Sequence, residues 1–363
     1  MRLLISVLLA FFIAACSSSN IPRSKKLDPT NGSVLIVPSA IPSEKLESPL
    51  KIKLIDKNGT TKVSWEVNYP VLNAKLDKEK NLFVLMDKSG TQSKLAGGIF
   101  NTIQMRDQSN NVIWTYTDDY LHHDFYLKEN GNVVLLRYYP MPKSFFKKLK
   151  VVTKKLYQDQ LWFDEIIEVN PKSNEIVWSW KSHKHMNWEE ELITHHGDVL
   201  HTNSIDYTNR FVKTKKPAYM ISSRHFSQVY VIDIESKKVV WNSPKNLFKH
   251  QHDASFLKNG NILVFNNNFN NSQVIEYSIP KEKIIWKYNG GDNIFAYSTF
   301  YSAYVSGAQR LTNGNTLITI GTRSLIIEVD EDGKVLWNYF LYDQQNQMST
   351  AWPFRTIFKA RQY

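Results

Sequence analysis

Residues 252–286 read HDASFLKNGNILVFNNNFNNSQVIEYSIPKEKIIW. The stretch contains four short runs rich in β-branched and aromatic residues, separated by turn-forming Asn, Gly and Pro, which is typical of four antiparallel strands. The pair Asn259-Gly260 lies between the first two runs, and we expect it to form a two-residue type I′ hairpin turn. The stretch is therefore predicted to be one four-stranded unit that ends in Trp286.

The end of this unit, a short apolar run closed by tryptophan, recurs along the chain. The six tryptophans are Trp65, Trp114, Trp178, Trp241, Trp286 and Trp337. The turn recurs at Asn130-Gly131 and Asn313-Gly314, with a variant at His196-Gly197-Asp198. Repeats of roughly 50 residues built from short strands indicate the four-stranded blades of a β-propeller.

The two ends of the chain complete the blade count. Residues 31–36 read as a second strand that no first strand precedes, and residues 354–360 read as a first strand that no second strand follows. Pairing the C-terminal strand with the N-terminal strands closes the ring and removes two open sheet edges. We therefore predict an all-β fold, a six-bladed β-propeller over residues 31–363. A stack of unrelated β-domains is the alternative.

Composition agrees with a folded, soluble body. Of 363 residues, 42% are hydrophobic and 22% are charged, which excludes a disordered chain and a polytopic membrane protein. The net charge is +11, but the charges are scattered and no Arg-rich helix or zinc-finger spacing accompanies them, so we expect no nucleic-acid partner. A basic balance also fits anionic ligands or an anionic lipid surface. The oligomeric state stays open.

The N-terminus indicates export. Residues 1–15 carry one cation followed by an apolar run that is too short to span a bilayer comfortably, as in a signal peptide. The run ends in Ala14-Ala15-Cys16, which resembles the lipobox of bacterial lipoproteins, and Cys16 is the only cysteine. Residues 16–30 are predicted to be a lipidated flexible tether. Ser17 is not the aspartate associated with inner-membrane retention, so we expect an anchor on the periplasmic side of the outer membrane.

Candidate chemistry lies at the starts of the channel-lining strands. In a propeller the first strand of each blade lines the channel, so polar residues there converge whatever their separation in sequence. The motifs are HHDFYLK at 122–128, HTNSI at 201–205, ISSR at 221–224 and QHDASFLK at 251–258. We expect HTNSI to begin a second strand, with His201 and Asn203 on one face. The sequence has no glycosidase-type carboxylate pair, Cys-x-x-Cys or Gly-rich phosphate loop.

These four motifs, with the Asn-Gly-Asn turns and the tryptophan strands, resemble the bacterial arylsulfotransferase family over about residues 60–340. The resemblance implies a six-bladed propeller that moves a sulfuryl group from one phenol to another through a histidine-bound intermediate, without a nucleotide donor. Better-known members carry a separate N-terminal β-domain, and we expect a short lipoprotein form without it. The resemblance implies no cofactor and no required metal; its partners are a phenolic sulfate donor and a phenolic acceptor.

The resemblance also assigns roles to residues. His252 is implied to be the nucleophile, and the residues implied around the sulfuryl oxygens are His123, His201, Asn203 and Arg224. His123 or His201 would serve as general acid and base. Arg323 occupies the place of Arg224 in a later blade and is a candidate for substrate binding.

Each assignment has a structural alternative. His252 and His123 could be structural or packing residues, and His201 and Asn203 could serve to hydrogen-bond buried backbone groups. Arg224 could pair with a local carboxylate. His122, His195, His196 and His225 are expected to be structural or solvated. The basic stretch 143–155 could be a lid, a lipid contact or, as we expect, a solvated loop. Alternative functions are aryl sulfate hydrolysis and a non-catalytic, lipid-anchored scaffold for envelope protein assembly.

Overall fold

The structure is a computed structural model that describes residues 31–39, 46, 48–90, 99–141, 144, 150–152, 156–186, 191–193, 197–291, 300–341, 356–357 and 359–363. The predicted signal peptide (1–15), the lipidation site Cys16 and the tether (16–30) lie outside the described residues. So do His195, His196 and most of the basic stretch 143–155.

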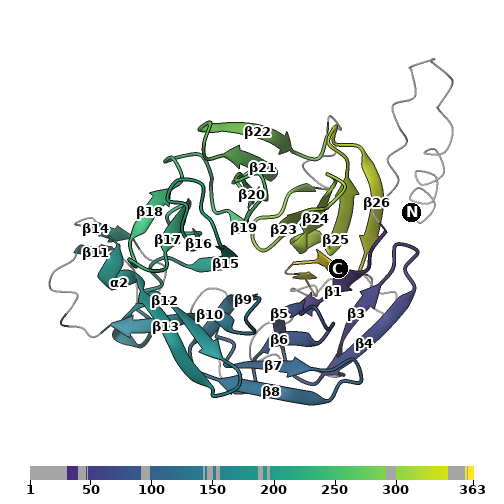
Figure 1. Ribbon diagram of the computed structural model, residues 1–363, viewed down its shortest axis with the longest axis horizontal. Helices are drawn as coiled ribbons and strands as arrows, with labels where there is room; N and C mark the ends of the chain where they lie inside the picture. Colours follow the sequence, from purple (N-terminus) through teal and green to yellow (C-terminus); the bar gives the residue numbers. More distant parts are fainter. Residues whose placement is uncertain are drawn as a thin grey trace, which may run out of the picture.

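Six four-stranded antiparallel sheets stand in a ring around a central axis (Figure 1). Blade 1 contains, from the axis outward, β28 (Arg361–Gln362), β1 (Val34–Ile36), β3 (Leu50–Ile55) and β4 (Thr61–Val67). Blade 2 contains β5 (Val71–Leu76), β6 (Leu82–Met86), β7 (Thr102–Arg106) and β8 (Val112–Thr117). Blade 3 contains β9 (Leu121–Leu127), β10 (Val133–Met141), β12 (Leu161–Asn170) and β13 (Glu175–Lys181).

The second half of the ring repeats the pattern. Blade 4 contains β15 (Thr202–Thr208), β16 (Ala218–Ser223), β17 (Gln228–Asp233) and β18 (Val239–Asn242). Blade 5 contains β19 (His252–Phe256), β20 (Ile262–Asn266), β21 (Gln273–Ser278) and β22 (Lys283–Tyr288). Blade 6 contains β23 (Gly307–Arg310), β24 (Thr316–Ile320), β25 (Leu325–Val329) and β26 (Val335–Phe340). The predicted six-bladed propeller is confirmed.

Smaller elements connect the blades. β2 (Pro38–Ser39) pairs with β27 (Thr356–Ile357), and β11 (Lys150–Val152), from the basic stretch, pairs in parallel with β14 (Glu191–Ile193). The short helices are η1 (Tyr157–Asp159), α2 (Ser182–His185) and η2 (Gly321–Arg323). In the described part of the chain, none of the helices has the length and apolar character needed to cross a bilayer.

The ring closes where the two ends of the chain meet. Val34 lies opposite Gln362 and Leu35 opposite Arg361, so the C-terminal strand is the innermost strand of blade 1. The predicted closure is confirmed, but the closing strand lies beyond residues 354–360. Thr356–Ile357 instead pair with β2, which occupies their backbone groups outside the blade. This removes the open edges that an unclosed ring would leave.

The repeated tryptophans lie on the outermost strands, and five of the six donate the indole N–H to the next blade, while Trp241 lies beside the ring of Tyr277 in blade 5. The indole N–H of Trp65 donates to Asp107 O at 2.7 Å, and that of Trp178 donates to Ile234 O at 3.0 Å. Trp337 donates to Lys57 O at 2.7 Å, which joins the last blade to the first. Because a buried indole N–H needs an acceptor, the repeat follows from one recurring contact between blades.

The Asn-Gly turns differ from the expected type I′ hairpins. In the turn at Lys128–Gly131, Gly131 N donates to Lys128 O at 3.0 Å, and only the glycine has a positive φ, of 86°. Gly260 and Gly314 close the same turn in blades 5 and 6. This is a type I turn followed by a left-handed glycine, so the preceding Asn needs no positive φ. Its side chain instead accepts a backbone N–H two residues later, as Asn130 does from Asn132.

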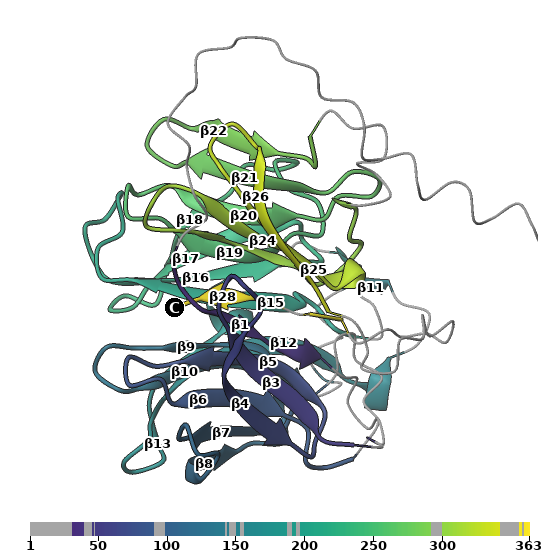
Figure 2. The ribbon, with the colours of Figure 1, turned by 90° about the vertical axis from the view of Figure 1, so that its right-hand side faces the viewer.

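The two faces of the ring differ in what they carry. We call the face at which the innermost strands begin the histidine face, and the face at which they end the turn face. Figure 2 shows β11 on the histidine face and the C-terminus on the turn face. HTNSI does not begin a second strand: β15 (Thr202–Thr208) is the innermost strand of blade 4. The Gly197 turn before it packs on blade 3, where Trp162 N donates to Gly197 O, rather than forming a blade hairpin.

Candidate active site

The innermost strands of blades 3, 4 and 5 start with a β-bulge, as β5 of blade 2 also does, and the bulge re-aims their side chains. The pairing register shifts between Leu135 and Arg137 opposite β9, between Thr202 and Ser204 in β15, and between His252 and Ser255 in β19. Beside the bulges, His123, His201 and Asp253 have positive φ values of 50°, 50° and 53°. Such backbone costs roughly 1–3 kcal/mol per residue and is concentrated at functional sites.

The bulges bring the predicted imidazoles together. The rings of His123 and His201 lie 4.6 Å apart, edge to face. His252 is close enough to act electrostatically on both, and Arg224 acts on His201 and His252. The three histidines are 2%, 5% and 3% exposed. The structure therefore gathers these residues from blades 3, 4 and 5 into one cluster, which we call the imidazole cluster (His123, His201, His252 and Arg224).

Each imidazole has a different partner at Nδ1. His252 Nδ1 lies 2.6 Å from Asn267 Oδ1 and 3.1 Å from His250 O, and His201 Nδ1 lies 2.7 Å from Asp198 Oδ2. Because amide and carboxylate oxygens only accept, both Nδ1 atoms carry the proton. In each ring Nε2 is then the nitrogen with the lone pair, as a nucleophile or base requires.

His123 has an imidazole partner instead. Its Nδ1 lies 2.9 Å from Nδ1 of His122, and His122 Nε2 lies 3.1 Å from Asp164 Oδ1. His122 is buried and stacks on Tyr138 with ring centroids 4.0 Å apart. The prediction that His122 is structural agrees with this placement. The stacked ring links His123 to a buried carboxylate.

Burial sets the charge of the cluster. Burial lowers the pKa of His252 to about 3. Burial, together with repulsion from neighbouring imidazoles, places the pKa of His123 and of His201 well below the usual value. Burial also raises the pKa of Asp164 and of Asp198. At neutral pH the three imidazoles are therefore uncharged, and the cation of the cluster is Arg224.

Arg224 and Asn203 occupy different depths. Arg224 follows β16 and is partly exposed, and its pKa is lowered by burial. Asn203 is fully buried, and its Nδ2 donates to Gln251 O at 2.8 Å. One of its two amide hydrogens thus holds the backbone just before His252, which is the backbone-satisfying role considered as its alternative.

Arg323 is not part of this cluster. It is exposed at the end of η2 and makes no hydrogen bond or ion pair with the other described residues. The analogy with Arg224 fails in position, because Arg224 is the first residue after β16 whereas Arg323 is the third residue after β24, at the end of η2. The substrate-binding role predicted for Arg323 has no geometric support here.

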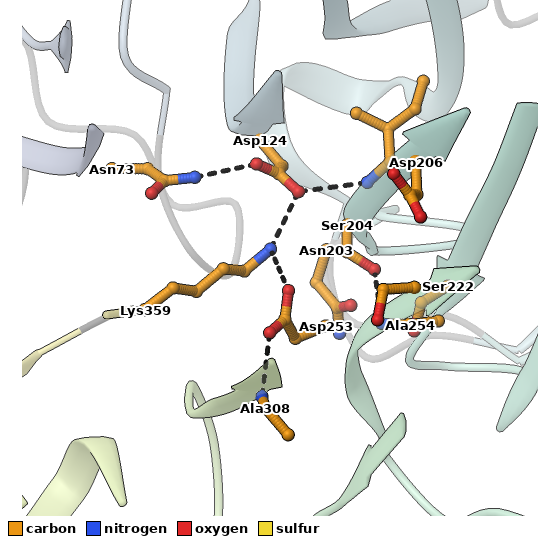
Figure 3. Close-up of polar contacts among 12 residues, drawn as sticks. Asn73, Asp124, Asn203, Ser204, Asp206, Ser222, Asp253, Ala254, Ala308 and Lys359 are labelled. Atoms are coloured by element: carbon orange, nitrogen blue, oxygen red, sulfur yellow. Dashed lines mark hydrogen bonds and ion pairs between the residues drawn. The ribbon is translucent and has the colours of Figure 1, made fainter. Parts of the chain in front are cut away.

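An ion layer closes the channel behind the imidazoles. Lys359 Nζ lies 2.8 Å from Asp124 Oδ2 and 3.2 Å from Asp253 Oδ1 (Figure 3). Lys75 also pairs with Asp124 at 3.0 Å, and Arg361 pairs with Asp253 at 2.5 Å. These five residues form what we call the ion layer. Sequence analysis missed it, although Lys359 and Arg361 alternate along the C-terminal segment, a signal for two inward cations.

On the turn-face side of the ion layer lies a cavity of about 230 Å³. It is lined by the ends of inner strands, including Tyr126, Asp206 and Tyr363. Burial raises the pKa of Asp206 to about 6. The ion layer therefore stands between this cavity and the imidazole cluster, which lies nearer the histidine face.

One group of side chains offers metal ligands. Ligand atoms of Asp198, His201 and His225 lie within 4.8 Å of one another. The rings of His201 and His225 are stacked, 4.8 Å apart with 29° between their planes. Nitrogen lone pairs lie in the ring planes, so stacked rings do not direct them at one point. Asp198 instead orients His201 by a hydrogen bond.

The fold and the cluster together define a propeller whose channel carries imidazoles and a guanidinium at one end. The family model for arylsulfotransferase (ASST) matches residues 75–342, well over half of the chain. The chain belongs to the arylsulfotransferase family. No curated protein sequence matches the chain.

Comparison with solved structures shows the fold. A protein of unknown function from Bacteroides caccae is 14% identical, with a TM-score of 0.57, and covers 91% of this chain and 98% of its own. Virginiamycin B lyase from Staphylococcus aureus is 9% identical, with a TM-score of 0.44, and covers 81% of this chain and 78% of its own.

Proposed function

We propose that the protein is an aryl-sulfate sulfotransferase that carries a sulfuryl group from a phenolic sulfate ester to a phenolic acceptor through sulfo-His252, by a ping-pong route. The observation that carries the proposal is the gathering of His123, His201 and His252 beside Arg224, within a chain of the arylsulfotransferase family. A scaffold function would give these buried imidazoles no role.

In the first half-reaction, His252 attacks the donor. The Nε2 lone pair forms an N–S bond while the S–O bond to the aryl group breaks, and the aryl oxygen leaves with the electron pair. Sulfuryl transfer should resemble phosphoryl transfer, with a loose, in-line transition state whose charge lies on the equatorial and leaving oxygens. The low pKa of His252 keeps its lone pair available at neutral pH.

Arg224 is the proposed electrostatic stabiliser of the transferred group. Its charge acts on both His201 and His252, which supports this role at the imidazole cluster. One well-placed donor contributes roughly 3–4 kcal/mol to such a transition state. The second amide N–H of Asn203 is a further candidate, while its first holds Gln251.

Protons pass through His123 or His201. Both are uncharged in the empty site, but an anionic sulfate ester replaces repulsion with attraction and raises their pKa values. The carboxylates of Asp164 and Asp198 then stabilise the imidazolium from behind. One ring protonates the leaving phenoxide and later takes the proton of the acceptor phenol, whose oxygen forms the new S–O bond as the N–S bond breaks.

Incubation with a chromogenic aryl sulfate, with and without an added phenol, tests the proposal. We expect release of the chromogenic phenol and a new sulfate ester on the added phenol. Free sulfate as the main product, independent of added phenol, would indicate a hydrolase. Absence of release from wild type, or equal release after His252→Ala, would remove the proposal.

The proposed site of action is the periplasmic side of the outer membrane, with the chain anchored by lipid at Cys16. The support is the sequence of residues 1–16. Growth with a labelled fatty acid should label the wild type and not Cys16→Ser, and the label should fractionate with the outer membrane. A wild-type chain that takes up no label would contradict the anchor.

A further inference from the structure

The partner of His252 is an asparagine with a fixed orientation. Asn267 directly follows β20 and is fully buried. Its Nδ2 donates to Ser302 O at 2.8 Å and to Val305 O at 3.1 Å. Turning the amide over would exchange both bonds for repulsion between oxygens, so the amide oxygen must face His252.

The backbone around this amide is built to hold it. Ser272 Oγ donates to Asn267 O at 2.9 Å and accepts from Ser302 N at 2.9 Å. Val305 has a φ of 53°, an uncommon conformation for a β-branched residue. Strain of this kind persists only where surrounding contacts determine the conformation. The linker before blade 6 is thus fastened to blade 5 around the Asn267 side chain.

The charge of the partner separates His252 from its neighbours. His201 meets the carboxylate of Asp198, and His123 reaches Asp164 through His122. A carboxylate behind an imidazole favours its protonated form, whereas an amide fixes the tautomer without adding charge. His252 alone among the three has an amide at Nδ1 and no carboxylate behind it, either directly or through a second imidazole.

We propose that Asn267 is a positioning residue for the nucleophile: its oxygen, at a shorter distance than His250 O, holds the proton on His252 Nδ1, and its lack of charge keeps the sulfo-imidazole reactive. The inference rests on the proposed function. When Nε2 takes the sulfuryl group, the ring becomes cationic and retains the Nδ1 proton. A carboxylate at position 267 would stabilise that cation and oppose cleavage of the N–S bond in the second half-reaction.

The first experiment needs no activity. Nitrogen NMR of protein with ¹⁵N-labelled histidine reports the tautomer and charge of each ring, and His252→Gln identifies the His252 signals. In wild type we expect the Nδ1–H tautomer, uncharged at pH 5 because its pKa is about 3. Asn267→Asp should raise the pKa of His252 by roughly 1–3 units, because the new carboxylate offsets the repulsion from Arg224 and Lys359 that lowers this pKa.

The matched control is Asn266→Asp. Asn266 is the adjacent buried asparagine, and its Oδ1 accepts from Lys249 N at 2.7 Å. The Asn266→Asp variant introduces the same charge one residue away, so any effect of folding or net charge appears in both variants. The control should leave the His252 tautomer and pKa unchanged. A His252 ring with its proton on Nε2, or a pKa equally shifted by both variants, would overturn the inference.

The second experiment measures the half-reactions. After mixing with an aryl sulfate, Asn267→Asp should accumulate the sulfo-protein and transfer to phenol about 10–100-fold more slowly than wild type, as expected for a charge effect of this size. Asn266→Asp should transfer at the wild-type rate. If wild type forms no sulfo-protein, the proposed function fails while the NMR result still decides the tautomer. If sulfo-protein forms and Asn267→Asp transfers normally, the role of Asn267 fails alone.

Discussion

The His123-Asp124 step in blade 3 and the His252-Asp253 step in blade 5 are nearly the same in sequence and differ in what they touch. Both histidines belong to the imidazole cluster, and both aspartates contact Lys359 in the ion layer. Behind the rings the two steps diverge, because His123 meets the imidazole of His122 whereas His252 meets the amide of Asn267.

The difference shows that a repeated motif fixes position but not chemistry. The bulged strands β9 and β19 each send one side chain toward the cluster and the next toward the ion layer. The partner at Nδ1, which comes from elsewhere in the blade, decides whether the ring can carry a proton. A ring backed by a carboxylate suits acid–base work, and a ring backed by an amide suits nucleophilic attack.

The largest expected effect on sulfuryl transfer comes from replacing the two histidines one at a time. His252→Gln should remove transfer and sulfo-protein formation altogether, because no other ring has the same uncharged partner. His123→Gln should slow turnover by about 10²–10⁴-fold, the usual range for a lost acid or base, yet still form sulfo-protein from an activated donor. Intact-mass measurement after mixing distinguishes them. Sulfo-protein in His252→Gln would contradict the assignment.

The carboxylate behind His123 gives the next effect. Asp164→Asn should slow transfer from donors with poor leaving phenols by roughly 10²-fold, because protonation of the phenoxide is lost. Nitrophenyl sulfate, whose phenoxide leaves without protonation, should react nearly as in wild type. The measurement is the dependence of rate on the acidity of the leaving phenol, in Asp164→Asn and in wild type. An equal loss with every donor would mean a structural role for Asp164.

The next prediction concerns Asp124 and Asp253, the aspartates that follow the two histidines and belong to the ion layer. Asp253→Asn leaves Arg361 with an unpaired buried charge and should lower the free energy of unfolding by about 3–5 kcal/mol. Asp124→Asn should cost a similar amount through Lys75. Adding Lys359→Met to either variant should recover part of the loss. Denaturant unfolding measures these values, and an unchanged midpoint in both single variants would contradict a structural ion layer.

The smallest effect, counted per pH unit, is a pH dependence of the free energy of unfolding. His252 has a folded pKa of about 3 against 6.5 in the unfolded chain, so the unfolded state binds more protons as pH falls below 6.5. This contribution lowers stability by about 1.4 kcal/mol per pH unit between pH 6.5 and 3. Asp206, whose pKa is raised to about 6, acts in the opposite direction. The slope should therefore be compared between wild type and His252→Gln, which should lose less stability on acidification. Equal slopes would contradict a buried, uncharged His252.

The sequence predicted features that repeat. A tryptophan marks every blade and an Asn-Gly turn marks three of them, because the same packing and the same hairpin recur around the ring, so the count of six and the closed ring could be predicted. The turn type could not, because a glycine in the left-handed region serves both kinds of hairpin. The first strand of blade 4 was misplaced because the Gly197 turn resembles a blade turn but packs on blade 3.

The parts of the site that were missed depend on contacts between distant segments. Asn267 lies in a run of asparagines that reads as a loop, and nothing local shows that its oxygen reaches His252. Lys359 reaches Asp124 across 235 positions of sequence. Arg323 was included by analogy between blades, but it is the last residue of η2, two residues further along its turn than Arg224. Motifs placed the imidazoles, but only the fold shows their partners.

The most direct test of the central claim is to trap and map the transferred group. Wild-type protein mixed with an aryl sulfate and quenched before acceptor is added should gain one sulfuryl group, located by peptide mapping on His252 and lost when phenol is supplied. A protein that turns over aryl sulfate with no adduct on His252, or with the adduct on His123 or His201, would contradict the account.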